Sequence, residues 1–165
     1  MKETLKYSAV LFSICFFAAI LLSAVASITQ PIIEETKAEQ ENNAIKEVMP
    51  QARGIEKVEE EGLVYYKAKD FSGNNIGYVF ISEAKGYSSV IRAVVSITPE
   101  GEIIAVKVLE QNETPGIGTQ ITEEKFLSRF KGKKALDNID SISGATVSSS
   151  ALIDSVKQTL KKIIQ

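Results

Sequence analysis

The stretch from Tyr7 to Ile33 contains no charged residue, and this feature limits the possible folds more than any other. As a helix it is long enough to cross a hydrocarbon layer of about 30 Å. Lys2 and Lys6 precede it, and two glutamates follow it at residues 34–35. Because positive charge near a span favours the cytoplasmic side, we expect a single-pass protein of the cytoplasmic (inner) membrane. Its N-terminus is then cytoplasmic and its larger part extracytoplasmic.

A cleaved signal peptide is the alternative interpretation of this stretch. Ala24-Val25-Ala26 matches an A-x-A cleavage site. The apolar run, however, continues past that site through Ile28 and exceeds the roughly 7–15 apolar residues of a signal peptide. These features favour an uncleaved anchor, and the intact mass of the membrane-extracted protein distinguishes the two.

The composition removes several kinds of chemistry. The chain has no His, and its single Cys15 lies inside the apolar run, so neither an internal disulfide nor a Cys-rich metal site is expected. The net charge of −2 does not favour a nucleic-acid partner. We therefore predict no metal site and no catalytic residue, and any redox activity requires an organic cofactor or the centres of a partner.

After the anchor, the pattern changes from apolar to polar. Residues from Glu34 to Met49 carry a sparse apolar stripe that predicts a helical stalk, which Pro50 limits. The Glu-rich segment from Ala52 to Glu61 predicts a solvated connection. We divide the chain into a cytoplasmic N-terminus (1–7), a transmembrane helix (8–30), a stalk with its connection (31–61) and an extracytoplasmic domain (62–165).

The domain begins with segments rich in β-branched residues and ends with helical patterns. Strands are expected at Leu63–Lys69, Ile76–Ile81, Val90–Ile97 and Ile103–Leu109. A short helix is expected from Thr122, as its N-cap, to Phe130, and an amphipathic helix from about Val147 to Ile164. This order predicts an α+β fold, with helices packed on a mostly antiparallel twisted sheet and a single N-terminal transmembrane helix before it.

Two polar stretches in the domain are candidates for a binding site. The loop from Glu113 to Gly118 contains Pro115-Gly116, which forces a sharp turn, and Gly118, which permits close backbone approach. The stretch from Ser143 to Ser149 opens the last helix with small residues and hydroxyls, as a phosphate site does. A tight connection and a Ser/Thr helix cap are the alternative interpretations of the two stretches.

The sequence Ser143-Gly144-Ala145-Thr146-Val147-Ser148 resembles the flavinylation motif of the covalent-FMN domain. This domain occurs in the G subunit of Rnf-type ion-translocating oxidoreductases and in the C subunit of the sodium-translocating NADH:quinone reductase. Gly86-Tyr87, the loop from Glu113 to Gly118, and the single N-terminal anchor resemble the Rnf-type G subunit in the same order along the chain. Gln111-Asn112 departs from the family, since many members carry a basic residue there.

The resemblance implies an FMN joined to Thr146 by a phosphoester, which a separate flavin transferase installs. It also implies which neighbours form the site. These are Ser143, Gly144 and Ala145 in the phosphate turn, Ser148 and Ser149 as hydrogen-bond donors, and Glu113, Thr114, Pro115 and Gly116 in a loop that approaches the flavin.

The function implied by the resemblance is electron transfer within a membrane complex. The complex moves electrons between ferredoxin and NAD and couples this to Na⁺ or H⁺ translocation. The partners are its other membrane and peripheral subunits, and this chain alone is not a complete enzyme. Two alternatives are a stand-alone, membrane-anchored flavinylated carrier and a non-redox anchored binding module.

Overall fold

The computed structural model describes residues 2–60 and 62–164. Met1, Glu61 and Gln165, which belong to the domain ranges predicted above, lie outside the described residues. The chain forms two compact units, one ending at Gln40 and the other beginning at Glu41. The second unit contains the sheet, the remaining helices and the candidate site.

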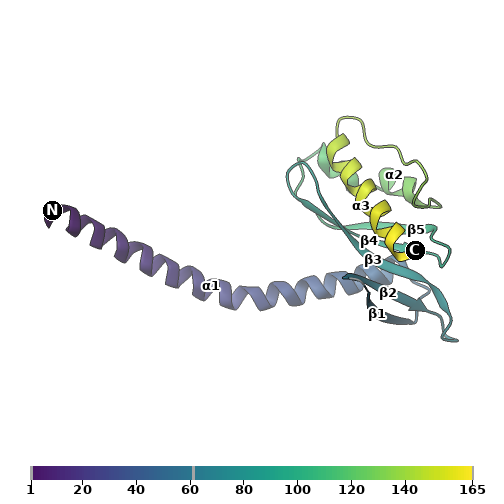
Figure 1. Ribbon diagram of the computed structural model, residues 1–165, viewed down its shortest axis with the longest axis horizontal. Coiled ribbons are helices and arrows are strands. Elements are labelled where there is room, and N and C mark those ends of the chain that lie inside the picture. The colour runs from purple at the N-terminus through teal and green to yellow at the C-terminus, as the bar shows by residue number, and fades with distance from the viewer. Residues whose placement is uncertain (1, 61, 165) are drawn as a thin grey trace. The chain divides into compact units, whose positions relative to one another are not determined.

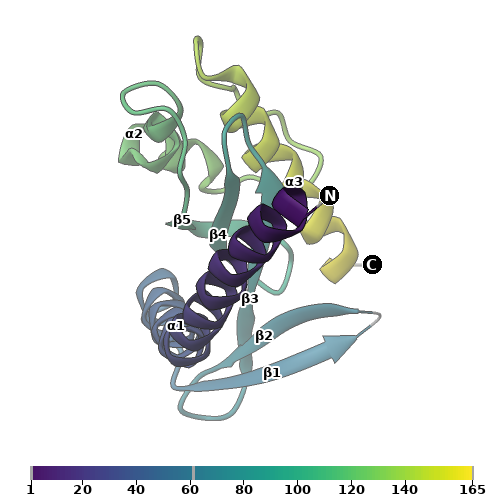
Figure 2. The same cartoon turned by 90° about the vertical axis from the view of Figure 1, so that its left-hand side faces the viewer.

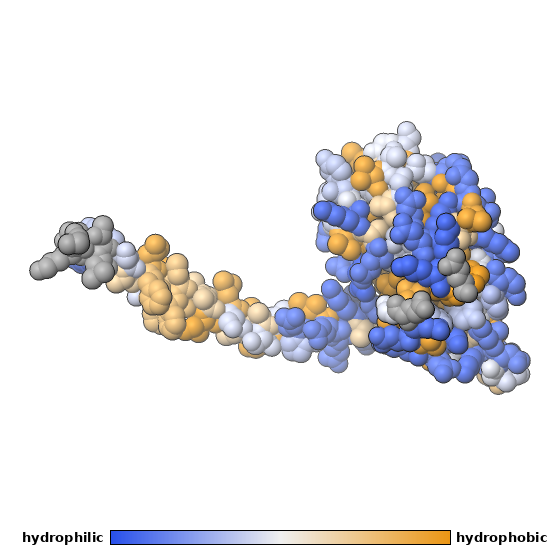
Figure 3. All heavy atoms as spheres, in the orientation of Figure 1, coloured by the Kyte–Doolittle hydropathy of each residue, from blue (hydrophilic) through white to orange (hydrophobic). Residues whose placement is uncertain are grey.

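The first helix, α1 (Lys2–Val48), is continuous and includes Pro31 in its interior. The sequence predicts a span and a stalk as separate segments, whereas the structure joins them in one helix. Among the described residues, only this helix is long and apolar enough to cross a membrane, with a mean hydropathy of 2.6 over its most apolar stretch. Figure 3 shows this apolar stretch in orange. The hydroxyls of Ser13 and Ser27 donate to carbonyls one turn earlier, which satisfies them within the helix.

The second unit is built on a five-stranded antiparallel meander in the order β1-β2-β3-β4-β5 (Figure 1). The strands are β1 (Gly54–Glu60), β2 (Leu63–Lys69), β3 (Asn75–Lys85), β4 (Val90–Ile97) and β5 (Ile103–Glu110). The prediction of an antiparallel sheet in an α+β domain is therefore confirmed.

Strand β1 contradicts the prediction of a connection before residue 62, although the segment is mostly exposed to solvent as predicted. It pairs along its whole length with β2, from Gly54 opposite Lys69 to Glu60 opposite Leu63. The sequence of β1 is polar because the strand lies at the sheet edge and most of its side chains are exposed. Charged side chains on an edge strand also discourage pairing with other chains.

The segment predicted as one helix from Thr122 to Phe130 consists of a short α-helix and a 3₁₀ turn, with another 3₁₀ turn before them. A 3₁₀ turn (Gly118–Thr122) precedes α2 (Glu124–Leu127), and a second 3₁₀ turn (Ser128–Phe130) follows it. Thr122 is not the N-cap of α2, because its hydroxyl donates to the carbonyl of Thr119 and Glu123 holds the cap position. The last helix, α3 (Thr146–Ile164), begins one residue before its predicted start.

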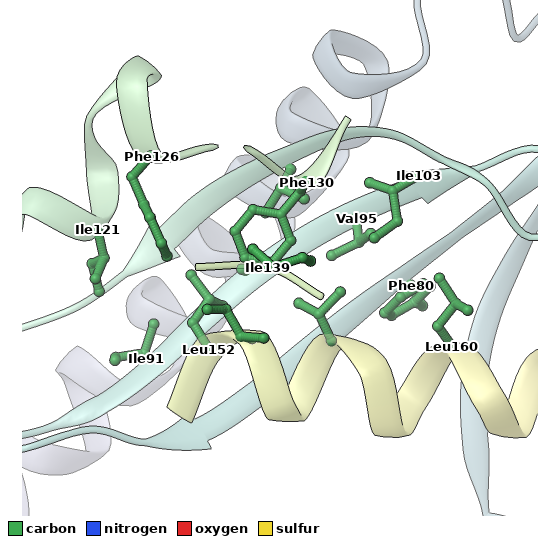
Figure 4. Close-up of a cluster of buried hydrophobic side chains, with 14 of the residues drawn as sticks. Phe80, Ile91, Val95, Ile103, Ile121, Phe126, Phe130, Ile139, Leu152 and Leu160 are labelled. Atoms are coloured by element: carbon green, nitrogen blue, oxygen red, sulfur yellow. The ribbon is translucent and has the colours of Figure 1, made fainter. Parts of the chain in front are cut away.

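Helix α3 and the α2 region cover one face of the sheet and bury the main core (Figure 2). Figure 4 shows Leu160 of α3 beside Phe80 of β3, and Leu152 of α3 beside Ile91 of β4, all within this core. Along β4, residues 91, 93, 95 and 97 face this core.

The C-terminal end of α1, which belongs to the second unit, covers the opposite face. Its apolar residues pack against Ala68, Val79 and Val94 of the sheet. These helix-end residues are Ala44, Ile45, Val48 and Met49. The hydroxyl of Ser96 donates to the Val48 carbonyl over 2.8 Å, which satisfies one of the unpaired carbonyls at the helix end.

Candidate functional site

A cleft of about 520 Å³ lies where the β3–β4 turn, the loop after β5 and the start of α3 meet. Its volume falls in the range of small-molecule and cofactor sites. The lining residues are Tyr87 from the turn, Glu113, Thr114, Ile117 and Gly118 from the loop, and Gly144, Ala145, Thr146, Val147 and Ser148 at the start of α3.

Thr146 is the first residue of α3, and its side chain is exposed at the cleft. The first amides of an α-helix have no carbonyl partner within the helix, and the helix dipole makes this end attractive to an anion. The hydroxyl of Thr146 makes only a long contact, 3.4 Å, with the Ile142 carbonyl. An accessible hydroxyl therefore lies beside amides that can donate hydrogen bonds to a phosphate.

The turn before α3 is fixed by Ser149 rather than by a ligand. Ser149 is buried, its hydroxyl donates to the Ala145 carbonyl over 2.8 Å, and its oxygen accepts from the Ile142 amide over 2.9 Å. Gly144 has a φ of 86°, a left-handed conformation that residues with a Cβ rarely adopt. This local network places Thr146 at the helix start.

The buried carboxylate of Glu113 joins the three segments of the cleft. Glu113 is 4% exposed. Its Oε1 accepts from the amides of Ser88 (3.0 Å) and Ser89 (2.9 Å) and from the Ser89 hydroxyl (3.2 Å). Its Oε2 accepts from the Tyr87 amide (3.1 Å) and the Ser148 hydroxyl (2.5 Å).

These donors keep Glu113 ionised in spite of its burial. Burial by itself raises the pKa of a carboxyl, but the hydrogen bonds from the Ser148 hydroxyl and the three turn amides outweigh it, so the pKa of Glu113 is lowered. Glu113 is the one formally charged side chain among the residues that line the cleft.

Two glycines make room for this carboxylate. A Cβ at Gly86 would lie 2.6 Å from Oε1 of Glu113, and a Cβ at Gly118 would lie 2.6 Å from the Cβ of Glu113. Both distances are shorter than side chains tolerate. The close approach expected at Gly118 therefore serves the side chains of Glu113 and Ser148.

The structure brings together six of the ten residues predicted for cofactor binding. Those at the cleft are Glu113, Thr114, Gly144, Ala145, Thr146 and Ser148, whereas Ser143, Ser149, Pro115 and Gly116 do not line it. Tyr87, Ile117, Gly118 and Val147 line the cleft but are absent from the predicted set. Tyr87, Ile117 and Val147 are exposed hydrophobic side chains, and the fold gathers them at one cleft. Such a cluster is informative, whereas a single exposed apolar residue is not.

Comparison with known proteins shows to which family of domains the second unit belongs. Residues 86–161, which contain the whole cleft, match the family model of the FMN-binding domain. The crystal structure of Shewanella oneidensis NqrC has a similar fold, with a TM-score of 0.53 and 24% identity, over 70% of this chain and 72% of that one. The C subunit of the Na⁺-translocating NADH-quinone reductase from Parabacteroides distasonis also has a TM-score of 0.53, with 22% identity, over 61% of this chain and 60% of that one. The second unit thus contains an FMN-binding domain.

Relatives found by sequence similarity narrow the family further. The G subunit of the proton-translocating ferredoxin:NAD⁺ oxidoreductase complex of Clostridium ljungdahlii is 30% identical, over 90% of this chain and 85% of the relative. The G subunit of the ion-translocating oxidoreductase complex of Methanosarcina acetivorans is 33% identical, over 94% of this chain and 92% of the relative. The chain belongs to the family of G subunits of ion-translocating oxidoreductase complexes, as the resemblance predicted.

Proposed function

We propose that this chain is an electron-transfer subunit that carries FMN on the Oγ of Thr146 through a phosphoester bond. The observation that carries the proposal is the position of that hydroxyl. Thr146 is exposed, it begins α3, and it lies in the cleft of a domain that matches the FMN-binding family. Attachment adds an anion at the helix start, where the dipole stabilises it.

The residues of the cleft fit such a group. Tyr87, Ile117 and Val147 offer exposed apolar surface for a flat ring system, and the free amides of α3 suit a phosphate. FMN, when bound, supplies one- and two-electron chemistry that side chains do not provide. A covalent bond makes retention independent of binding equilibrium, which matters for a domain that faces the extracytoplasmic space.

The relatives support a membrane complex as the setting. The related G subunits belong to ferredoxin:NAD⁺ oxidoreductase complexes that translocate protons in Clostridium ljungdahlii and Na⁺ in Acetobacterium woodii. We assign this chain to a complex of the same type, with the span at residues 8–30, the N-terminus in the cytoplasm and the FMN domain outside. The span contains no ionisable carboxylate, so the ion path belongs to the partner subunits.

Expression with a flavin transferase tests the attachment. The wild-type band should fluoresce under ultraviolet light on a denaturing gel, and its intact mass should increase by one FMN less one water. Thr146→Ala should be dark and unmodified. Thr122→Ala, which removes an exposed hydroxyl away from the cleft, should stay fluorescent and serves as the matched control.

Two results would contradict the proposal. A dark wild-type band in the presence of active transferase would remove the covalent flavin, and a fluorescent Thr146→Ala band would move the attachment elsewhere. Purification from native membranes addresses the setting, because a member of a complex should co-purify with polytopic partners and a free carrier should purify alone.

A further inference from the structure

We propose that Glu113 is a positioning residue for flavin attachment: it holds Thr146 and the facing wall of the cleft in the arrangement that attachment requires, without itself contacting the flavin. The proposal deepens the proposed function and rests on attachment at Thr146. Its basis is the set of contacts made by one buried side chain.

Glu113 connects both walls of the cleft. Ser148, which donates to its Oε2 over 2.5 Å, lies in the same first turn of α3 as Thr146. Tyr87, whose amide donates to the same oxygen, comes from the β3–β4 turn and lines the cleft as well. The loop that carries Glu113 supplies the remaining side of the cleft. Glu113 thus belongs to one of the three segments and hydrogen-bonds to the other two, which no other side chain in the described part of the chain does.

The carboxylate has no capacity left for a ligand. An ionised carboxylate has about four lone-pair sites. Five donors already share its two oxygens, and only 4% of the residue is exposed. Its effect on a flavin must therefore be exerted through the segments that it holds.

The negative charge, and not only the shape, is required for this role. All five partners donate, so both oxygens must accept. A glutamine of the same size would turn an NH₂ group toward at least two of these donors. The Glu113→Gln variant keeps the volume of the side chain between Gly86 and Gly118 and loosens the connection between the walls.

The test measures labelling of the full-length chain in membranes with a limiting amount of flavin transferase. The fraction of modified chain is followed over time by intact mass. Glu113→Gln should lower the initial rate of labelling about ten-fold or more, since small misplacements of a reacting group have effects of this size. Ser148→Ala, which removes one donor, should lower it by a smaller factor. Glu100→Gln, on the exposed β4–β5 turn, is the matched control and should label at the wild-type rate.

Non-additivity distinguishes positioning from a general loss of folding. Labelling is compared only for variants whose circular dichroism and urea midpoint show a fully folded population. If Glu113 acts through Ser148, then Glu113→Gln should lower the rate by a smaller factor in the Ser148→Ala background than in the wild type. Equal factors in the two backgrounds would overturn that connection.

The proposal is overturned if folded Glu113→Gln is labelled at the wild-type rate. If Glu113→Gln does not fold, Ser148→Ala decides in its place, and a wild-type rate in that variant overturns the proposal. A failure of the proposed function looks different, because then the wild-type chain and Glu100→Gln also stay unmodified.

Discussion

The two faces of the sheet each bury an apolar cluster and hold a charged residue, but the charge is stabilised differently on each face. On the side of α3, Glu113 is 4% exposed, and its partners are amides and hydroxyls that carry no net charge. On the side of the α1 end, the side chain of Arg92 is 18% exposed and pairs with Glu41 over 2.6 Å and with Glu83 over 2.7 Å. Glu113 is therefore stabilised by fixed dipoles inside the protein, whereas Arg92 is stabilised by carboxylates that are accessible to water.

This difference indicates which side carries function. A buried anion among fixed dipoles loses much of its stabilisation when a donor moves, so it imposes a geometry on its surroundings. A half-exposed ion pair tolerates movement and contributes little to stability. The α3 face is therefore suited to hold a site, and the other face is suited to pack the C-terminal end of α1.

The largest effect is expected for Glu113→Leu. This change leaves three amides and two hydroxyls without their acceptor in a buried place, and we expect a loss of about 4 kcal/mol in the free energy of unfolding. Urea unfolding of the unflavinylated chain in detergent measures it by tyrosine fluorescence, since the sequence has no Trp. A loss below about 1 kcal/mol would mean that the network does not hold the fold.

On the opposite face, Ile45→Ala should cost about 3 kcal/mol, because Ile45 is 1% exposed and packs against the sheet, so its truncation leaves a cavity. Ile33→Ala provides the matched control, because Ile33 lies on the same helix with an exposed side chain. Equal urea midpoints for the two variants would show that the end of α1 is not part of the domain core.

A smaller effect is expected from pH. The pKa of Glu113 is lowered in the folded state, so its ionised form stabilises the fold above the unfolded pKa of about 4.3. That contribution is lost as the pH falls through the folded pKa. The urea midpoint should therefore decrease as the pH falls from neutral through this acidic range, and the decrease should be smaller in Glu113→Gln.

Asp70 provides the comparison for this pH effect. Its pKa is also lowered, with the amide hydrogen bonds of the β2–β3 turn outweighing a smaller effect of burial, but the residue is only partly buried. Asp70→Asn should change the pH dependence less than Glu113→Gln does. The reverse order would show that the buried network does not govern acid stability.

The sequence allowed the architecture to be predicted because strands and helices have strong local patterns. Strand β4 was found from its β-branched residues, although both of its faces are buried and no alternation is visible. Edge strand β1 was missed because its residues are charged, and only its pairing with β2 makes it a strand.

The site was predicted in part, for a related reason. Thr146 and its neighbours form a local motif that one short stretch reveals. The contacts of Glu113 join it to residues 24 to 26 positions earlier in the chain and to Ser148, 35 positions later. Nothing in a local pattern indicates such pairings, and the exposure of Tyr87 and Ile117 at the cleft depends on them.

The smallest effect should come from Arg92→Met, which keeps the aliphatic part of the side chain and removes the charge. Its partners Glu83 and Glu110 are about half exposed, and only Glu41 is comparably shielded. We expect a loss of about 1 kcal/mol or less in the free energy of unfolding, and a smaller loss at high salt because screening weakens the wild-type pairs. Lys69→Met is the control for a solvent-exposed ion pair, because Lys69 pairs with Glu56 at the surface, and its loss in the free energy of unfolding should be smaller still. A loss above about 3 kcal/mol that does not depend on salt would place Arg92 in the same class as Glu113, and the contrast between the two faces would then be lost.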